Sequence, residues 1–164
     1  MNFLETNGVT IHVDNGATIN FKALHEKNGA IFGCSVTNNS GKVNISRGTL
    51  AIRGYRIEFT QNEDVYDINS YQTSDTSNYL VIAKISVNQT QRSSSLEFIV
   101  KRESSGLTQN NIEEGTTGVF EYPLVRFAKS NNVITTFTSL VSQIVLNDYE
   151  VATDEEIKEL LGIS

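Results

Sequence analysis

The sequence predicts an all-β, mainly antiparallel domain, a small β-barrel or β-sandwich, followed by a short C-terminal α-helix. Three features predict it: apolar residues that alternate with polar ones between turns, a long apolar strand at 79–87, and a helix-capping pattern near the end of the chain. Side chains of a strand point to opposite faces with a period of two, so alternation indicates strands with one buried face. We expect an antiparallel β domain over residues 1–150 and a capped docking or oligomerisation helix over residues 151–164.

The alternation in residues 41–59 slips by one position at Gly54. Such a slip turns the core face outward unless a tight turn or a β-bulge restores the register, and glycine permits both because it tolerates positive φ. A turn-like segment, 46–49, precedes it and contains Gly48. We therefore expect a structural turn or bulge at Gly48 and at Gly54.

Further strands are expected where alternation or apolar runs recur, at residues 9–13, 30–36, 79–87, 96–100, 119–128 and 133–137. Pro123 lacks an amide donor, which predicts an edge position or an interruption in its strand. Polar loops are expected at 60–78 and 104–118, where the periodicity stops.

Two segments allow both a strand and a helix. Residues 17–27 fit either the second strand of a hairpin closed by Asn15-Gly16 or a short helix capped by Thr18. Residues 137–146 fit a helical template, but their threonine, serine and valine content favours a strand.

The C-terminal segment carries a capping box. The Thr153 hydroxyl can accept from the amide of Glu156, whose carboxylate reaches back to the start of the helix. Ile157, Leu160 and Leu161 fall on one face, and a glycine follows. Because isolated helices shorter than ~12–15 residues are marginal in water, this face is predicted to dock on its own domain or on a neighbouring subunit.

Composition argues against several classes of function. The net charge is −6 and no cluster of Lys and Arg is present, which disfavours nucleic acid and anionic membrane surfaces as partners. No apolar stretch approaches the ~18 residues of a spanning helix, and no signal peptide is recognisable, so we expect synthesis in a cytosol without secretion. Cys34 is the single cysteine and is expected to be a small buried hydrophobe.

Enzymatic motifs are not recognisable. His12 and His25 have no metal-ligand spacing, and the acidic residues between 63 and 75 lack the ordered alternation of a calcium loop. We expect no enzyme, with no catalytic residue, no metal and no cofactor.

The loop 60–79 is the best candidate for binding. Tyr66, Tyr71 and Tyr79 are set among Asn, Asp, Ser and Gln, a mixture of rigid contact area and adaptable hydrogen bonding. Such a loop can stack on a sugar ring or meet another protein. In the alternative, favoured here, the loop is a long connection whose tyrosines cover the end of the barrel.

Taken in order, several segments resemble small tail and baseplate-associated structural proteins of phages and prophages of Gram-positive bacteria. They read NGVTIHV, GAIFGCSV, SRGTLAIRGYRIEF, YLVIAKISV, EYPLVRFAKSNNVI and ATDEEIKELLG. The resemblance spans most of the chain except loop 60–78 and residues 135–150, and its motifs are those of β-hairpins.

The resemblance implies a virion component without catalytic residues, in the tail, baseplate or a fibre. It implies a symmetric homo-oligomer, often a trimer, in contact with other virion proteins. The alternative that the sequence leaves open is a carbohydrate-binding or host-receptor-binding module that uses the tyrosines of loop 60–79 on a host-surface polysaccharide.

Overall fold

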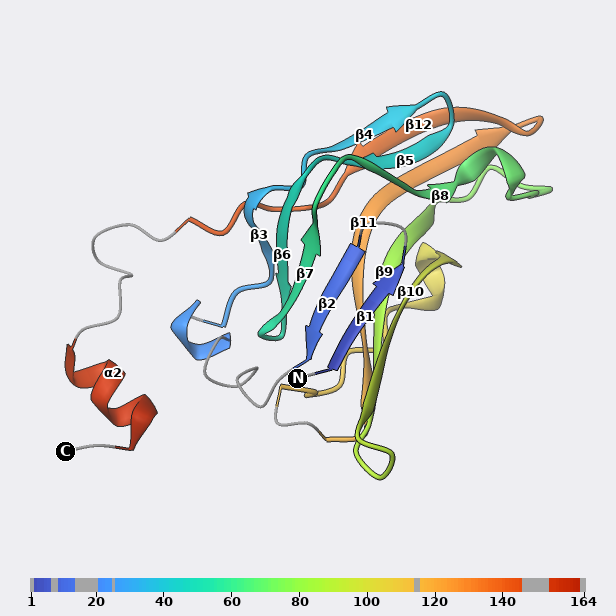
Figure 1. The fold of residues 1–164 in the computed structure, drawn as a ribbon. Helices are drawn as coiled ribbons and strands as arrows, with labels where there is room; N and C mark the ends of the chain where they lie inside the picture. The colour runs from blue at the N-terminus through green and yellow to red at the C-terminus, as the bar shows by residue number, and fades with distance from the viewer. Residues whose placement is uncertain are drawn as a thin grey trace.

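The computed structural model describes residues 2–6, 9–13, 21–24, 26–113, 116–145 and 154–162. Its strands form antiparallel sheets of five, four and three strands (Figure 1). An all-β, mainly antiparallel domain with a short C-terminal helix is therefore confirmed. The sheets of the described part of the chain do not close into a barrel.

The five-stranded sheet contains the two N-terminal strands. In spatial order its strands are β1 (Asn2–Thr6), β2 (Val9–Val13), β7 (Tyr55–Phe59), β6 (Gly48–Ile52) and β3 (Gly29–Gly33). The strand expected at 9–13 is β2. The sequence did not predict β1, because the apolar residues Phe3 and Leu4 are neighbours rather than alternating.

The hairpin from β6 to β7 explains the slip in the apolar pattern. Arg53 and Gly54 connect the two strands and have φ values of 49° and 81°. Positive φ at both central residues is what a type I′ turn requires, and its twist matches that of the strands it joins. The expectation of a tight turn at Gly54 is confirmed.

The segment 46–49 differs from the expected hairpin turn. It carries the chain from the three-stranded into the five-stranded sheet, and Gly48 is the first residue of β6. A Cβ at Gly48 would lie 2.3 Å from the carbonyl oxygen of Phe32 and 2.6 Å from the amide nitrogen of Cys34. The glycine is needed for a close approach of two backbones, since no larger residue fits there.

The four-stranded sheet confirms the strands expected in the second half of the chain. In spatial order its strands are β10 (Ser93–Arg102), β9 (Tyr79–Asn88), β11 (Gly118–Ser130) and β12 (Val133–Ser139). Pro123 lies in the central strand β11 rather than at an edge, and the register to β9 shifts between Pro123 and Val125. The proline thus marks an interruption, which was one of the two expectations.

The three-stranded sheet is an extension that the sequence patterns only partly predicted. Its strands are β4 (Val36–Asn39), β5 (Lys42–Ile45) and β8 (Glu63–Asp67). The single strand expected at 30–36 is divided between β3 and β4, because Gly33 and Cys34 both have positive φ. The expectation of a loop over residues 60–78 is wrong for residues 63–70, which form β8 and the 3-10 turn η1 (Ile68–Ser70).

One apolar core joins the three sheets. Phe59, Ile45 and Phe127, one from each sheet, are at most 1% exposed and belong to the same cluster. Sheets that share a core in this way are packed as layers, as in a sandwich. The sandwich form of the prediction is thus the one that agrees with the structure.

The two ambiguous segments are now partly assigned. Residues 21–23 are helical, so the strand alternative is wrong for them, while Thr18 and the hairpin residues Asn15-Gly16 lie outside the described residues. In the segment 137–146, β12 continues to Ser139, and residues 140–145 form an arm without helix that crosses to β3.

The helix expected at the C-terminus is α2 (Asp154–Leu161). It ends at Gly162, whose φ is 68° and whose amide donates to the Glu159 carbonyl at 3.1 Å. Thr153 and the side chain of Glu156 lie outside the described part of the structure, as does the boundary expected at residues 150 and 151.

Candidate functional site

The tyrosines of the predicted binding loop belong to the core or pack against it. Tyr66 lies in β8, Tyr71 follows η1, and Tyr79 begins β9 with only 4% of its surface exposed. The rings of Tyr71 and Tyr79 meet edge to face with centroids 5.3 Å apart. Tyr79 also stacks on Phe127 at 5.7 Å. These two tyrosines therefore extend the core, as the alternative for this loop expected.

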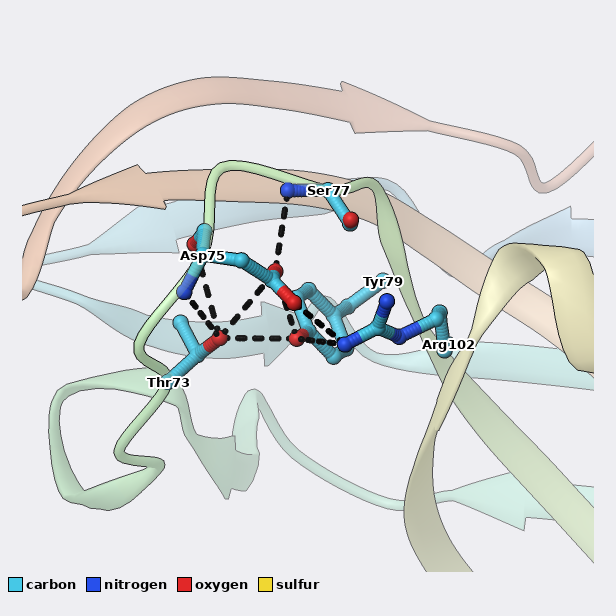
Figure 2. A network of polar contacts seen from close by, with 5 residues as sticks. All are labelled: Thr73, Asp75, Ser77, Tyr79 and Arg102. Atoms are coloured by element: carbon cyan, nitrogen blue, oxygen red, sulfur yellow. Dashed lines mark hydrogen bonds and ion pairs between the residues drawn. The ribbon is translucent and has the colours of Figure 1, made fainter.

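A network of polar contacts surrounds the Tyr79 hydroxyl (Figure 2). Tyr79 donates to the Asp75 carboxylate at 2.8 Å, and its hydroxyl lies 2.7 Å from Oγ1 of Thr73. The Ser77 amide donates to the same carboxylate at 3.0 Å. The Arg102 guanidinium on β10 pairs with Asp75, and its carbon lies 5.7 Å from the centroid of the Tyr79 ring.

The charges of this network stabilise each other. Hydrogen bonds from the Tyr79 hydroxyl and then from the Ser77 amide lower the pKa of Asp75 below its ordinary value. The negative charge of Asp75 raises the pKa of Arg102. Since the carboxylate is engaged by several donors, the network fastens the loop 71–78 to β9 and β10 and has the character of a structural clasp.

A buried lysine fastens the other end of the same loop. Lys129 on β11 is fully buried, and its ammonium donates to the carbonyl oxygens of Ile68 at 3.0 Å and Tyr71 at 2.8 Å. A buried ammonium is tolerated only where such acceptors replace water. This role could not be predicted from the sequence, because the spacing between Lys129 and η1 along the chain carries no signal of the contact.

The other chemically reactive side chains have structural surroundings. The Asp64 carboxylate accepts hydrogen bonds from the amides of Asn44 at 2.9 Å and Asn39 at 3.1 Å. Cys34 is 1% exposed, and burial raises the pKa of its thiol to about 12, so the expectation of a buried hydrophobe is confirmed. Within the described residues, no group of three His, Cys, Asp or Glu side chains could hold a metal ion. His25 and the side chain of His12 lie outside the description.

A shallow cavity of about 460 Å³ lies where β9 turns into β10, next to the start of β11. Its lining residues include Ser86, Gln91, Ser95 and Thr117, together with Val87 and Val119, and most of the lining surface is apolar. The volume lies within the ~300–1,000 Å³ of typical ligand pockets. The sequence analysis did not indicate this site, because its residues are ordinary turn and strand residues.

Three apolar side chains on β3 and on the arm 140–145 that pairs with it are exposed. We call Ile31, Phe32 and Val145 the β3 patch; their exposed fractions are 39%, 57% and 65%. A register shift between Ala30 and Phe32 interrupts the pairing of β3 with β6. Single exposed apolar residues are ordinary, whereas neighbouring ones indicate a contact surface.

The arm is attached to β3 mainly through the backbone. The Ala30 amide donates to the Ser142 carbonyl at 2.8 Å, and the Ile144 amide donates to the Ala30 carbonyl at 2.7 Å. The side chain of Gln143 adds a bond to the Gly33 carbonyl at 2.9 Å. Ser142, Gln143 and Val145 are exposed, so the arm is a surface element on the edge of the sheet.

Helix α2 lies beyond the arm (Figure 1). Of the face predicted for docking, Leu160 is partly buried and Leu161 is 55% exposed, while the side chain of Ile157 is outside the description. The structure therefore leaves at least one apolar side chain of this face in contact with solvent.

Comparisons with known proteins do not add a family. Neither a family model nor a curated protein sequence matches this chain. None of the helices in the described residues is both long and apolar enough to cross a membrane.

Proposed function

We propose that this chain is a structural protein that works by assembly with other proteins. The resemblance to tail and baseplate-associated proteins supports a place in a phage or prophage particle, as a tail, baseplate or fibre-associated component. The proposed partners are other copies of the chain, with a trimer favoured, and other virion proteins.

The observation that carries this proposal is the exposure of apolar side chains on β3, on the arm 140–145 and on α2. Phe32 and Val145 are more than half exposed in a molecule whose core aromatics are almost fully buried. Helix α2 has only eight residues and leaves Leu161 exposed. A helix of this length gains most of its stability from packing, so a partner surface is expected.

Contacts that hold the loop 60–79 in one conformation also support this proposal. Asp75, Arg102 and Tyr79 bind one another, and Lys129 binds the carbonyl oxygens at the start of the loop. A loop that is fastened at both ends offers a rigid surface, which suits a permanent contact in a particle.

The test is the solution mass by light scattering of the full chain and of the chain without residues 151–164. We expect a defined oligomer that dissociates on truncation. The paired variant Leu160→Asp with Leu161→Asp should have the same effect, and Lys158→Ala, which keeps the apolar face of the helix, should not. A wild-type protein that is monomeric at all concentrations would refute the proposal.

A second candidate is binding of a host-surface polysaccharide. The specific observation in its favour is the cavity beside the β9–β10 turn, which has a mostly apolar lining with a few polar residues, as small-molecule sites commonly have. A glycan array would test it, with Ser95→Phe to fill the cavity and Tyr66→Ala to probe the loop that the sequence indicated. An array without hits would remove this candidate.

A further inference from the structure

We infer that strand β12 of one copy of this chain pairs antiparallel with β12 of a second copy, so that their four-stranded sheets continue into each other. The inference rests on the proposed function and deepens it, because it names a surface through which copies assemble. Two identical strands that pair in this way are related by a twofold axis, and each offers the same residues to the other.

The first support is the distribution of charge along the chain. The two longest stretches without Asp, Glu, Lys or Arg are residues 28–41 and 130–147, and the next longest is 104–112. The structure brings the first two together, because the arm bonds to β3, and because β4 and β12 come within 8 Å of each other, measured between Cα atoms (Figure 1). Copies with a net charge of −6 repel each other, so they can approach most closely where this uncharged side of each faces the other.

The second support is a comparison of the strands at the edges of the described sheets. The edge strands β1, β8 and β10 carry charged side chains, and the edge of β3 is bonded to the arm. Of the two uncharged edges that remain, β4 has four residues and β12 has seven. Proteins protect sheet edges from pairing with charges, with short strands or with a covering segment. The edge of β12 has none of these protections.

The third support is the direction of the backbone groups of β12. The Leu140 amide donates to the Leu124 carbonyl at 2.8 Å, which makes the partners Val125 and Ser139 a non-hydrogen-bonded pair. The alternation of an antiparallel ladder then directs the N–H and C=O groups of Phe137 and Ser139 away from β11. Within the described part of the chain, these groups have no hydrogen-bond partner. They are therefore available to a further strand.

A bulge in β12 determines the register of the contact. Thr135 lies at a register shift and has no partner in β11. Since a bulge disrupts the ladder, the new pairing is confined to residues 136–139. The twofold axis then passes beside Thr138, which faces Thr138 of the second copy, a favourable cross-strand pair. On each side of it, Phe137 of one copy and Ser139 of the other exchange both backbone hydrogen bonds.

The first test is a disulfide that forms only at the twofold axis. In the predicted register the Cα atoms of the two Thr138 residues lie about 4.5 Å apart, so Thr138→Cys should give a disulfide-linked dimer on non-reducing gels after mild oxidation. The matched control is Thr136→Cys, which is equally exposed and lies on the same face of the strand. Its two copies would be more than ~10 Å apart along the strands, beyond the reach of a disulfide. Cys34 stays in place, since it is buried.

The second test measures association by light scattering over a range of concentrations. Ser139→Pro removes an N–H that points away from β11, so the fold keeps its own bonds while the contact loses a donor from each copy. We expect the dissociation constant to rise at least ~10-fold, with circular dichroism unchanged. Ser139→Ala keeps the N–H and should associate like the unaltered chain. As a second variant, Thr138→Lys places like charges opposite each other and should weaken association more at low salt than at high salt.

The outcomes separate this inference from the proposed function. An oligomer that gives no Thr138→Cys cross-link and tolerates both Ser139→Pro and Thr138→Lys would overturn the inference and leave the proposed function intact. Equal cross-linking of Thr136→Cys and Thr138→Cys would also overturn it, because such products arise from random collision. A monomer at all concentrations would overturn both.

Discussion

The substitution Lys129→Met tests whether a buried ammonium holds the loop after β8 in place. Methionine has nearly the same length and volume as lysine, so it fills the space without a cavity and removes only the charge and the donors. Lys129 is 0% exposed and donates to two backbone carbonyls, those of Ile68 and Tyr71. The variant therefore isolates the contribution of these two hydrogen bonds.

The expected loss follows from what happens to the two acceptors. The Ile68 carbonyl also accepts from the Tyr71 amide at 3.1 Å, so it keeps a partner. The Tyr71 carbonyl loses the ammonium, and a buried polar group that loses its partner costs about 1–3 kcal/mol. Relief of the buried charge offsets part of this cost. We expect Lys129→Met to lower the free energy of unfolding by about 2 kcal/mol.

The measurement is urea denaturation followed by tyrosine fluorescence, with the midpoint and the m-value compared between variants. The matched control is Lys84→Met on β9, whose ammonium lies 4.0 Å from Glu97 and is partly exposed. Ion pairs of that kind contribute about 0–1 kcal/mol, so the control should change stability little. An unchanged or higher midpoint for Lys129→Met would show that the desolvation of the ammonium outweighs its hydrogen bonds, and would refute the reasoning.

Three further predictions address other parts of the fold. Gly48→Ala should cost about 3 kcal/mol in thermal or urea unfolding, because its Cβ would lie 2.3 Å from a backbone oxygen, whereas Gly118→Ala, whose Cβ would lie 3.0 Å from the Cβ of Asn110, should cost less, about 1 kcal/mol. The native Cys34 thiol, with its pKa raised to about 12, should not react with iodoacetamide at pH 8 until the protein is unfolded, and rapid native labelling would contradict its burial. The pKa of Asp75 is lowered in the folded state, so the carboxylate stabilises the fold above its unfolded pKa near ~4, and this stabilisation is lost as the pH falls through the folded pKa. Asp75→Asn should therefore make the free energy of unfolding less dependent on pH in that acidic range. An unchanged pH dependence in the variant would count against the clasp.

Strands with a regular apolar pattern could be predicted from the sequence. The strand β9 and its partner β10 pair throughout their length, and both show the alternation or the apolar run from which they were expected. The turn at Gly54 was also recognisable, because a shift of apolar phase has few structural explanations. These features depend on neighbours in sequence, which is why a single sequence reveals them.

The strand β8 could not be predicted in the same way. It is an edge strand of the small sheet and pairs only with β5. Its sequence EDVYD is polar at most positions. A polar edge strand lacks the regular alternation of apolar residues that indicates a strand, so its sequence resembles that of a loop. Backbone pairing with β5 and the packing of Val65 and Tyr66 against the core give β8 its structure.

Contacts between distant residues account for the rest of what the sequence did not show. Tyr79 and Phe127 stack although 47 other residues separate them in the chain, and only the pairing of β9 with β11 brings them together. The same pairing places Tyr79 in the core, where Tyr71 packs against it, rather than on a ligand-binding surface. The turn at Asp75 was not predicted, although an aspartate that accepts from the amide two residues on is a common turn motif.

The residues that stabilise the fold of one copy differ from those expected to bind other copies. The core and Lys129 lie within the three sheets, and the Asp75 clasp fastens the loop 71–78 to them, whereas the arm 140–145, although its backbone is bonded to β3, and α2 carry exposed side chains. Exposed side chains contribute little to folding, so Phe32→Asp should leave the unfolding midpoint nearly unchanged even where it abolishes assembly. Unfolding and light scattering on the same variants can then be compared. If a patch variant lost folding stability and assembly together, the β3 patch would be part of the fold of a single copy, and the contact between copies would have to be sought elsewhere.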